Sequence, residues 1–169
     1  MKCNQKGFTL VEIAIVLVII GLLVGGVLKG QSMIHNAKVK RVVGTADEMR
    51  AAIYTYYDRF GHLPGDANRN GQITAAESPR VFQDLMQANI ISGDFDGTNY
   101  PNHPFGGSYR VLWYSPAGGM AGNFIRFDLL PGDVGLEIDT KHDDGTHNSG
   151  SIRASGAYTG ATLSLYMPM

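Results

Sequence analysis

Residues 6–28 read KGFTLVEIAIVLVIIGLLVGGVL, and this stretch decides the fold because it is almost entirely apolar. The run from Phe8 to Leu28 has 21 residues, in which Glu12 is the only charged side chain and Thr9 the only other polar one. A helix rises about 1.5 Å per residue, so the run covers roughly 30 Å, the thickness of a bilayer core. The sequence therefore predicts a membrane-spanning helix near the N-terminus.

A short basic leader precedes the apolar run. Residues 1–7 contain two lysines and no acidic residue, a distribution that favours retention of the leader on the cytoplasmic side of a membrane. A secretory signal peptide would have a shorter apolar region, of about 7–15 residues, followed by a small-residue cleavage site. Residues 29–33, Lys-Gly-Gln-Ser-Met, offer no convincing site of that kind. The apolar run is therefore expected to remain in the protein.

Glu12 is the unusual residue of this run. A carboxylate inside a bilayer costs roughly 2–3 kcal/mol or more, so it implies a partner. Cleavage between Gly7 and Phe8 would create an amine four residues before Glu12, and residues four apart share one face of a helix. A helix N-terminus also favours a nearby anion. The carboxylate is thus expected to pair with a free amine, its own or that of a neighbouring copy.

Gly7, Phe8 and Glu12, with the basic leader and the apolar run around them, resemble the processing signature of type IV pilins and type II secretion pseudopilins. In that family a prepilin peptidase removes the leader on the cytoplasmic face and methylates the new N-terminal amine. The resemblance implies cleavage between Gly7 and Phe8, N-methylation of Phe8, and a role for Glu12 in assembly. Processing would remove Cys3, the only cysteine, whereas many major pilins close a C-terminal loop with a disulfide.

A helical pattern continues past the apolar run. Between Val39 and Phe60, apolar residues recur at alternating spacings of three and four, which places them in one stripe along a helix. Proline is absent between residues 8 and 59, and Gly61 followed by Pro64 supplies stop signals. We therefore expect one helix from about residue 8 to residue 59. An aromatic cluster near its end is also expected to contact the core: Tyr54, Tyr56, Tyr57 and Phe60.

The remainder of the chain is typical of a small head with mixed secondary structure. The expected elements are a short helix at 79–88, strands at 108–115, 123–130, 134–138 and 162–166, and a turn at 116–119. A three- or four-stranded antiparallel sheet would cover the apolar stripe of the long helix. The predicted fold class is therefore α+β, with a long N-terminal helix packed on a small sheet. The expected divisions are a leader at 1–7, a transmembrane and assembly segment at 8–30, and a head at 31–169 that includes the second half of the helix.

An oxygen-rich stretch follows the long helix. Residues 66–77, DANRNGQITAAE, fit the 12-residue spacing of a calcium loop. Calcium needs about six or more oxygen ligands, and a loop with few charged ligands suits weak binding outside the cytoplasm. The expected ligands are the main-chain carbonyl of Gln72 and the side chains of Asp66, Asn68, Asn70, Thr74 and Glu77.

Two other interpretations of residues 66–77 remain open. Asparagine- and glycine-rich loops are common turns, and Thr74 with Glu77 also matches a helix capping box. The capping box would place Pro79 inside a helix, where its ring clashes. A helix with Ser78 as its cap and Pro79 at its first position is the better start, and it leaves Glu77 free for the loop.

A second acidic segment lies between residues 138 and 145. It has three carboxylates within six residues, at Asp139, Asp143 and Asp144. Together they are a weaker candidate site for a hard cation, and the competing interpretation is an exposed Asp-Gly turn. Residues 63–66 and the acidic segment with its continuation to Arg153 are similar to a subgroup of Gram-negative pilin-like proteins.

The sequence has no catalytic constellation. Its five histidines lack metal-ligand spacing, and no phosphate-cradling glycine loop lies between a strand and a helix. A net charge of −1 with 17% charged residues excludes a sequence-wide basic field for nucleic acid and a highly charged disordered chain. We therefore expect a structural protein and not an enzyme, with calcium as the only cofactor considered.

The resemblance also implies a location and a set of partners. The protein would wait in the inner membrane of a Gram-negative cell, with its head in the periplasm, and would then join a filament outside the cell. Its partners would be the prepilin peptidase, the inner-membrane assembly machinery, membrane lipid, and other copies of itself or related pilins. The alternative is a minor pilin or a type II secretion pseudopilin that acts in filament priming, secretion or tip adhesion.

Overall fold

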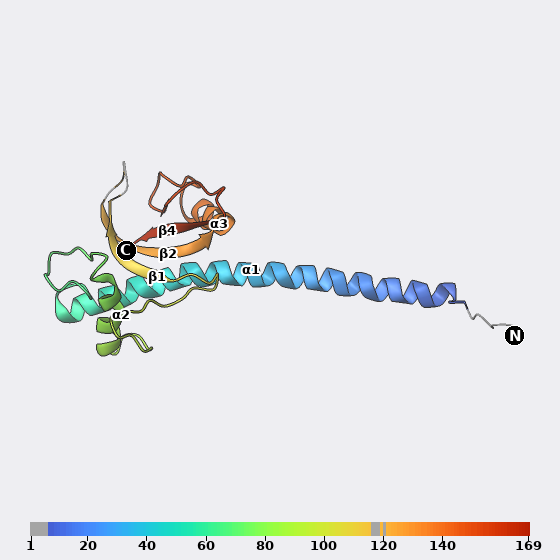
Figure 1. The fold of residues 1–169 in the computed structure, drawn as a ribbon, viewed down its shortest axis with the longest axis horizontal. Coiled ribbons are helices and arrows are strands. Elements are labelled where there is room, and N and C mark those ends of the chain that lie inside the picture. Colours follow the sequence, from blue (N-terminus) through green and yellow to red (C-terminus); the bar gives the residue numbers. More distant parts are fainter. Residues whose placement is uncertain (1–6, 116–118, 120) are drawn as a thin grey trace. The chain divides into compact units, whose positions relative to one another are not determined.

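The computed structural model describes residues 7–115, 119 and 121–169. The chain divides into two compact units, one up to Ala37 and one from Lys38 to Met169, and the first helix contributes to both. The elements follow in the order α1 (Leu10–Phe60), α2 (Ser78–Gln87), β1 (Tyr109–Tyr114), β2 (Gly122–Pro131), α3 (Gly132–His142), β3 (Arg153–Ala154) and β4 (Thr162–Pro168). Figure 1 labels all of them except β3.

The first unit consists of the first part of α1. Its large apolar side chains lie in the open, with exposed fractions between 48% at Ile13 and 91% at Leu10. An 18-residue window of α1 is long and apolar enough to cross a membrane, and none of that window is buried in the protein. The predicted apolar helix is thus confirmed, and within the described part of the chain its surface stays uncovered.

The second unit begins with the last part of α1, whose apolar stripe is buried as predicted. The buried apolar residues of this stripe are Val39, Val42, Ala46, Met49, Ala52, Ile53 and Tyr56. The aromatic cluster behaves differently from the prediction, because Tyr54, Tyr57 and Phe60 are 45–48% exposed. The helix ends at Phe60, and Gly61 follows with a φ of +75°, a conformation that glycine adopts without strain.

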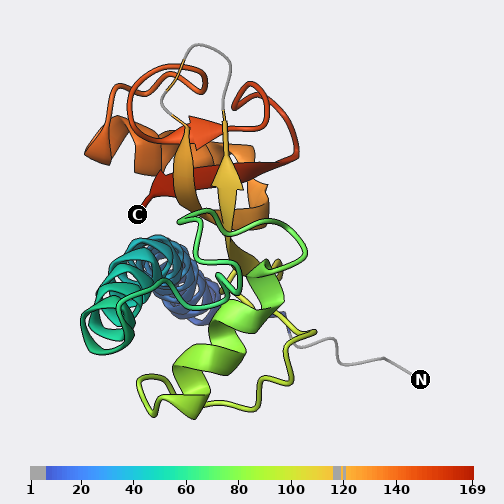
Figure 2. The ribbon, with the colours of Figure 1, turned by 90° about the vertical axis from the view of Figure 1, so that its left-hand side faces the viewer.

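Four antiparallel strands form one sheet in the order β1-β2-β4-β3. Figure 2 shows this sheet in a view along the axis of α1. The hairpin of β1 and β2 pairs Tyr109 with Phe127 and Tyr114 with Gly122. The predicted hairpin and the predicted strand at 162–166 are confirmed, whereas the two-residue strand β3 was not predicted. Apart from residue 119, the turn expected at 116–119 lies outside the described residues.

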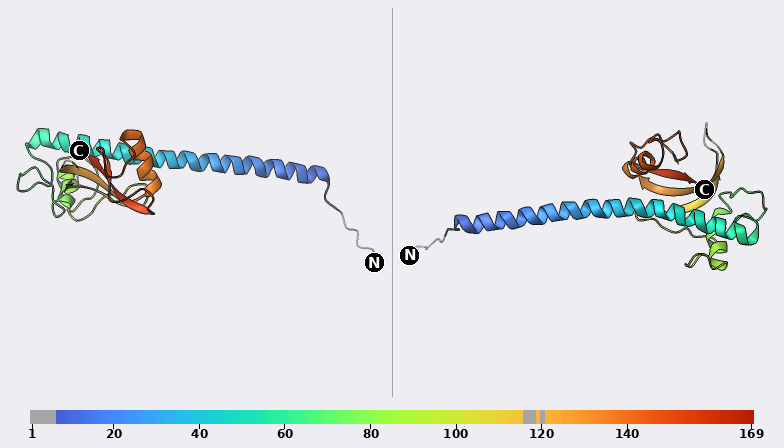
Figure 3. Two further views of the ribbon diagram at one scale, coloured as in Figure 1. Left: turned by 90° about the horizontal axis from the view of Figure 1, so that it is seen from above. Right: turned by 180° about the vertical axis from the view of Figure 1, so that it is seen from behind.

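The strand predicted at 134–138 is wrong, because these residues belong to the helix α3. Of the apolar residues in this segment, Leu136 is 42% exposed while Val134 and Ile138 are buried. Val134 and Ile138 are four residues apart, so in a helix they share one face. That face packs against β2 and β4, and in both views of Figure 3 α3 lies at the end of β2.

The core of the second unit joins the last part of α1, the helices α2 and α3, and the sheet. Phe82 of α2, Phe127 of β2 and Leu165 of β4 are fully buried members of one apolar cluster that includes the stripe of α1. The short helix predicted at 79–88 is confirmed as α2, which packs against β1. The head is therefore held by apolar contacts between elements that are far apart in the sequence.

A partly buried ion-pair cluster lies on the sheet at Asp128, where the pairing of β2 with β4 shifts register. The Asp128 carboxylate lies 2.6 Å from Nη2 of Arg110 on β1 and 2.6 Å from Nε of Arg126 on β2. It also accepts a hydrogen bond of 2.8 Å from the hydroxyl of Ser164 on β4. One carboxylate thus links three neighbouring strands.

Candidate processing and assembly site

The start of α1 is a capping box formed by Thr9 and Glu12. Thr9 directly precedes the helix, and Glu12 is the third residue of its first turn. Oε2 of Glu12 accepts hydrogen bonds from the backbone N–H and from the hydroxyl of Thr9, both at 2.8 Å. In return, the N–H of Glu12 donates to Oγ1 of Thr9 at 3.3 Å. These bonds satisfy N–H groups that have no partner within the helix.

The capping box gives Glu12 a partner in its own chain that sequence reasoning missed. The Thr-x-x-Glu spacing was visible at residues 9–12, but the carboxylate was assigned only to a free amine. Both Thr9 bonds use Oε2, so the carboxylate keeps further acceptor positions for another donor. Glu12 itself is exposed.

The residues on either side of the predicted cleavage point have no structural role in the chain as it stands. Phe8 is 85% exposed. A Cβ added at Gly7 would meet no atom within 4 Å apart from its immediate chain neighbours. The fold therefore does not require glycine at this position, and a requirement for glycine there would come from a partner.

The oxygen-rich loop predicted to bind calcium is a series of hydrogen-bonded turns. Asp66 is 2% exposed, and its carboxylate accepts the N–H groups of Asn70 at 3.1 Å and Gly71 at 2.8 Å. The side-chain oxygen of Asn68 accepts the N–H of Asn70 at 2.9 Å, and that of Asn70 accepts the N–H of Gln72 at 2.8 Å. The predicted ligand positions therefore share one compact loop, and these three side chains bind its backbone.

Glu77 closes the same loop. Its Oε2 accepts the N–H and the hydroxyl of Thr74, at 2.9 and 2.7 Å, and its Oε1 accepts the amide of Asn68 at 3.3 Å. Pro79 lies in the first turn of α2, as expected. The helix itself begins at Ser78, and Glu77 occupies the N-cap position. The prediction of Ser78 as the cap is therefore wrong by one residue. Glu77 is part of the loop, yet already engaged with Thr74.

Contacts with the β1–β2 hairpin hold the loop in place. Ile73 is fully buried, and its N–H donates to the side-chain oxygen of Asn123 at 2.9 Å while its carbonyl accepts the N–H of Trp113 at 2.6 Å. The Asn123 amide also donates to the carbonyl of Gly71 at 2.8 Å. Sequence reasoning missed these anchors because Trp113 and Asn123 lie 40 and 50 residues beyond Ile73 along the chain.

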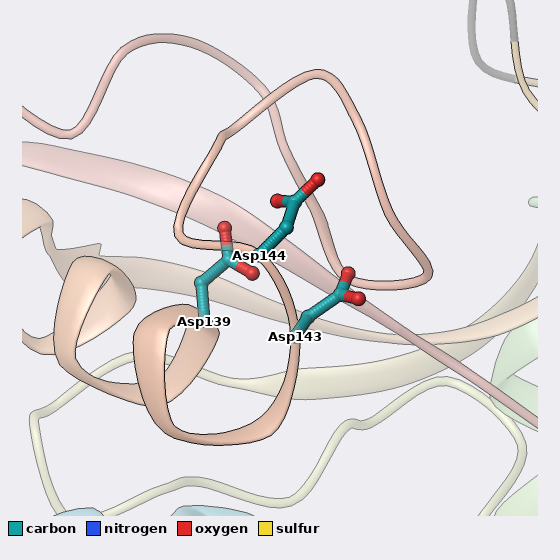
Figure 4. Close-up of side chains that lie close together, drawn as sticks. All are labelled: Asp139, Asp143 and Asp144. Atoms are coloured by element: carbon teal, nitrogen blue, oxygen red, sulfur yellow. The ribbon is translucent and has the colours of Figure 1, made fainter.

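The second acidic segment forms a cluster at the end of α3. One carboxylate oxygen each from Asp139, Asp143 and Asp144 lies within 4.8 Å of the others (Figure 4). Asp139 is fully buried, and its Oδ2 accepts the hydroxyl of Tyr158 at 2.5 Å. Burial raises the pKa of Asp139, and the Tyr158 hydroxyl and the backbone N–H of Gly145 offset part of that rise. The interpretation as a simple exposed turn is therefore wrong for Asp139.

Fold and N-terminal site together define a pilin-like α+β protein, with an uncovered apolar helix and a small antiparallel head. Residues 2–28 match the family model of the prokaryotic N-terminal methylation motif. The chain is 35% identical over 159 residues to a fimbrial protein of Neisseria meningitidis serogroup B, an alignment that covers 84% of this chain and 93% of the relative. The chain belongs to the type IV pilin family.

Two further relatives agree with this family. The chain is 28% identical over 156 residues to the type IV major pilin protein PilE of Neisseria gonorrhoeae, with 90% of each chain covered. It is 30% identical over 127 residues to the type IV major fimbrial protein FimA of Dichelobacter nodosus, with 74% of this chain and 72% of the relative covered. No solved structure matches. These relatives are structural pilins and not enzymes.

Proposed function

We propose that this pilin is a structural subunit of a type IV pilus-like filament, assembled through the apolar part of α1. The observation that carries the proposal is the uncovered apolar surface of that helix, where side chains such as Leu22 and Leu23 are 73% and 63% exposed. An apolar surface this large needs lipid or another protein to cover it. Lipid would cover it before assembly, and helices of other copies would cover it in the filament.

The N-terminus is proposed to mature before assembly. A prepilin peptidase would cut between Gly7 and Phe8 on the cytoplasmic face and methylate the new amine of Phe8. Support comes from the match of residues 2–28 to the methylation motif and from the exposure of Phe8 beside a glycine that the fold does not need. The head would then stand in the periplasm, while the inner-membrane assembly machinery adds the subunit to the filament.

Glu12 is proposed to recruit the amine of an incoming copy. Its carboxylate is held at the helix start by Thr9 through Oε2, which leaves Oε1 for an ionic partner. A carboxylate that meets a cationic amine away from water forms a strong, charge-assisted hydrogen bond. The pairing would align each new helix with those already assembled, because it relates the same two residues of successive copies.

The test is the fate of the wild-type protein in its own cells. Sheared filaments should contain the chain without residues 1–7, with a mass that includes one methyl group at Phe8. An intact leader in the mature protein would contradict the processing proposal. Recovery of the processed protein only with the cell envelope would contradict the filament proposal.

The copy number per filament separates the main proposal from its alternative. The chain without its leader has no cysteine, so it lacks the disulfide-closed loop of many major pilins, which favours a minor pilin or a type II secretion pseudopilin as the second candidate. Quantitative mass spectrometry of purified filaments should find very many copies for a major subunit. A few copies beside an abundant second pilin would favour the minor role.

A further inference from the structure

We propose that Asp139, Asp143 and Asp144 form a calcium site in the loop between α3 and β3. The site lies wholly in the second unit of the chain, and it does not depend on how the apolar helix assembles. Nothing in the names of the relatives assigns a metal to this loop.

The distances between the three carboxylates fit a single shared ion. Calcium binds oxygen at about 2.4 Å, so two oxygens on one ion are separated by at most about 4.8 Å. One oxygen from each of the three residues already lies within that distance of the other two. Figure 4 shows the three side chains close together, with Asp139 at the end of α3 and the other two on the segment that leaves it.

A buried oxygen of Asp139 supplies the second observation. Asp139 is fully buried, and its Oδ2 accepts the hydroxyl of Tyr158. Its Oδ1 is also buried and has no hydrogen bond of good geometry from the residues that the structure describes, although the Gly145 N–H lies near enough to the carboxylate to favour its charged form. A buried carboxylate oxygen without a partner is unfavourable. A cation at the cluster would be the partner that this oxygen lacks.

The charge of the cluster is not balanced by contact with a basic side chain. Among the described residues, none of the three aspartates forms an ion pair with lysine or arginine. Lys141, which is the nearest lysine in sequence, pairs with Glu137 at 2.6 Å. Arg153 attracts Asp144 from a longer distance without forming an ion pair. Three carboxylates this close still repel one another, and a divalent cation would remove most of that repulsion.

The surrounding loop keeps the carboxylates oriented and leaves one side open. Asp143 accepts the N–H of Ile152 at 2.7 Å, while Asp144 accepts the N–H of Thr146 at 2.8 Å. Gly150, with a φ of +70°, lies so close to the Asp143 carboxylate that a Cβ would collide with it. Asp144 is exposed, so water can complete the coordination sphere. An irregular, partly hydrated set of oxygens suits calcium better than magnesium, which demands near-octahedral geometry.

Calcium at this position would strengthen the edge of the sheet. The loop that follows Asp144 leads directly into β3, which pairs with β4 and forms an edge strand of the sheet that the structure describes. An ion that ties the end of α3 to this loop would restrain how β3 docks. The expected consequence is a head that is more stable in calcium-containing medium than in chelator.

The experiment measures calcium binding to the full-length protein in detergent micelles after removal of metal with chelator. Isothermal titration with calcium chloride should show a binding event that Asp144→Asn weakens by roughly tenfold or more, because it removes a charged ligand. Asp139→Asn should abolish the same event. Magnesium chloride should compete weakly. Circular dichroism of each variant checks that the fold is retained. Because Asp144 is exposed, Asp144→Asn should fold normally, and the test remains valid if Asp139→Asn unfolds.

Two control variants separate this site from other acids. Asp96→Asn changes an exposed aspartate whose carboxylate accepts the N–H of Thr98 at 2.8 Å, a contact like that of Asp144, and should leave calcium binding unchanged. Asp66→Asn changes the first acidic loop and should leave this binding event in place. Absence of calcium binding at millimolar concentration would overturn the proposal. Binding with the wild-type stoichiometry and affinity in both Asp144→Asn and Asp139→Asn, or binding that Asp66→Asn alone removes, would overturn it as well.

Discussion

The two parts of α1 present apolar surface in opposite ways. Between Leu10 and Ile34 the large apolar side chains are 48–91% exposed, whereas the apolar stripe from Val39 to Tyr56 is at most 8% exposed. The sequence differs in the same sense, because the first part is apolar on all faces and the second part only on one. The apolar surface of the second part is covered by the head of the same chain, and that of the first part needs a partner outside the chain.

This difference predicts where the effect of a substitution should appear. Changes in the first part should alter processing or assembly and leave the stability of the head unchanged. Changes in the second part should lower the stability of the head and leave processing unchanged. A substitution in the first part that changed the stability of the head, or one in the second part that changed processing, would show that the two parts are coupled.

The largest expected effect is at the cleavage point. Gly7→Arg should leave the full 169-residue chain in the membrane, because a peptidase that fits closely around the backbone has no room for a side chain. The folded head should be unaffected, since a side chain at residue 7 meets nothing in the chain. Intact mass spectrometry of membrane fractions measures the result. Gly21→Ala, whose Cβ is equally free of contacts, is the matched control and should be processed normally.

The next effect is at Glu12, where two substitutions separate charge from capping. Glu12→Gln can still accept hydrogen bonds from Thr9 but cannot pair ionically with an amine, and Glu12→Ala loses both. Both variants should be processed and both should yield few sheared filaments, while the melting temperature of the head stays at the wild-type value. Normal filament yield from Glu12→Gln would show that the capping box alone is needed, and would refute the proposed pairing.

A matched pair of isoleucines tests the division directly. Ile53 is fully buried and Ile13 is 48% exposed, so the same change to alanine samples both kinds of surface. Ile53→Ala should lower the free energy of unfolding by about 2–5 kcal/mol, because it leaves a cavity in the core. Ile13→Ala should leave the unfolding of the head unchanged. Thermal unfolding followed by circular dichroism measures both, and equal losses in the two variants would contradict the division.

Much of the fold was predictable because its signals are local. The apolar run, the stripe from Val39 onward and the stop at Gly61 each depend on neighbouring residues, and the predicted end of α1 is within one residue of the observed one. Helix α3 was not predictable, because the short run from Val134 to Ile138 fits the two-residue period of a strand and the four-residue spacing of a helix equally well. Its contacts with β2 and β4 decide in favour of the helix.

The candidate sites show the same limit. The Thr9–Glu12 capping box had a local signal that was passed over in favour of an external partner. The anchors of the 66–77 loop at Asn123 and Trp113 had none, because only the tertiary fold brings that hairpin to the loop. The hydrogen bond of Asp139 had no local signal either, since its donor Tyr158 lies nineteen residues away along the chain. Sequence patterns identified which residues carry oxygen ligands, and the fold decides which of those oxygens lack partners.

The smallest expected effect is at the 66–77 loop, where calcium binding remains a prediction. Any metal there would lie in the second unit, so calcium should raise the melting temperature of the head without changing processing. A ligand in hundredfold excess over its dissociation constant adds about 2.7 kcal/mol if it binds only the folded state. Because the loop has few charged ligands, binding should be weak and the excess at millimolar calcium lower than hundredfold, so the gain should be smaller than that value.

The measurement is the difference in melting temperature between millimolar calcium and chelator, with the full-length protein in detergent. Asp66→Ala will lower the melting temperature in both media, because its carboxylate accepts two loop N–H groups, so only the difference between media reports the metal. In an Asp144→Asn background, which removes the other acidic site, Asp66→Ala or Glu77→Ala should abolish whatever calcium effect remains. If Asp144→Asn alone removes the whole effect, residues 66–77 are a hydrogen-bonded turn that closes on Glu77 and leads into α2 without metal.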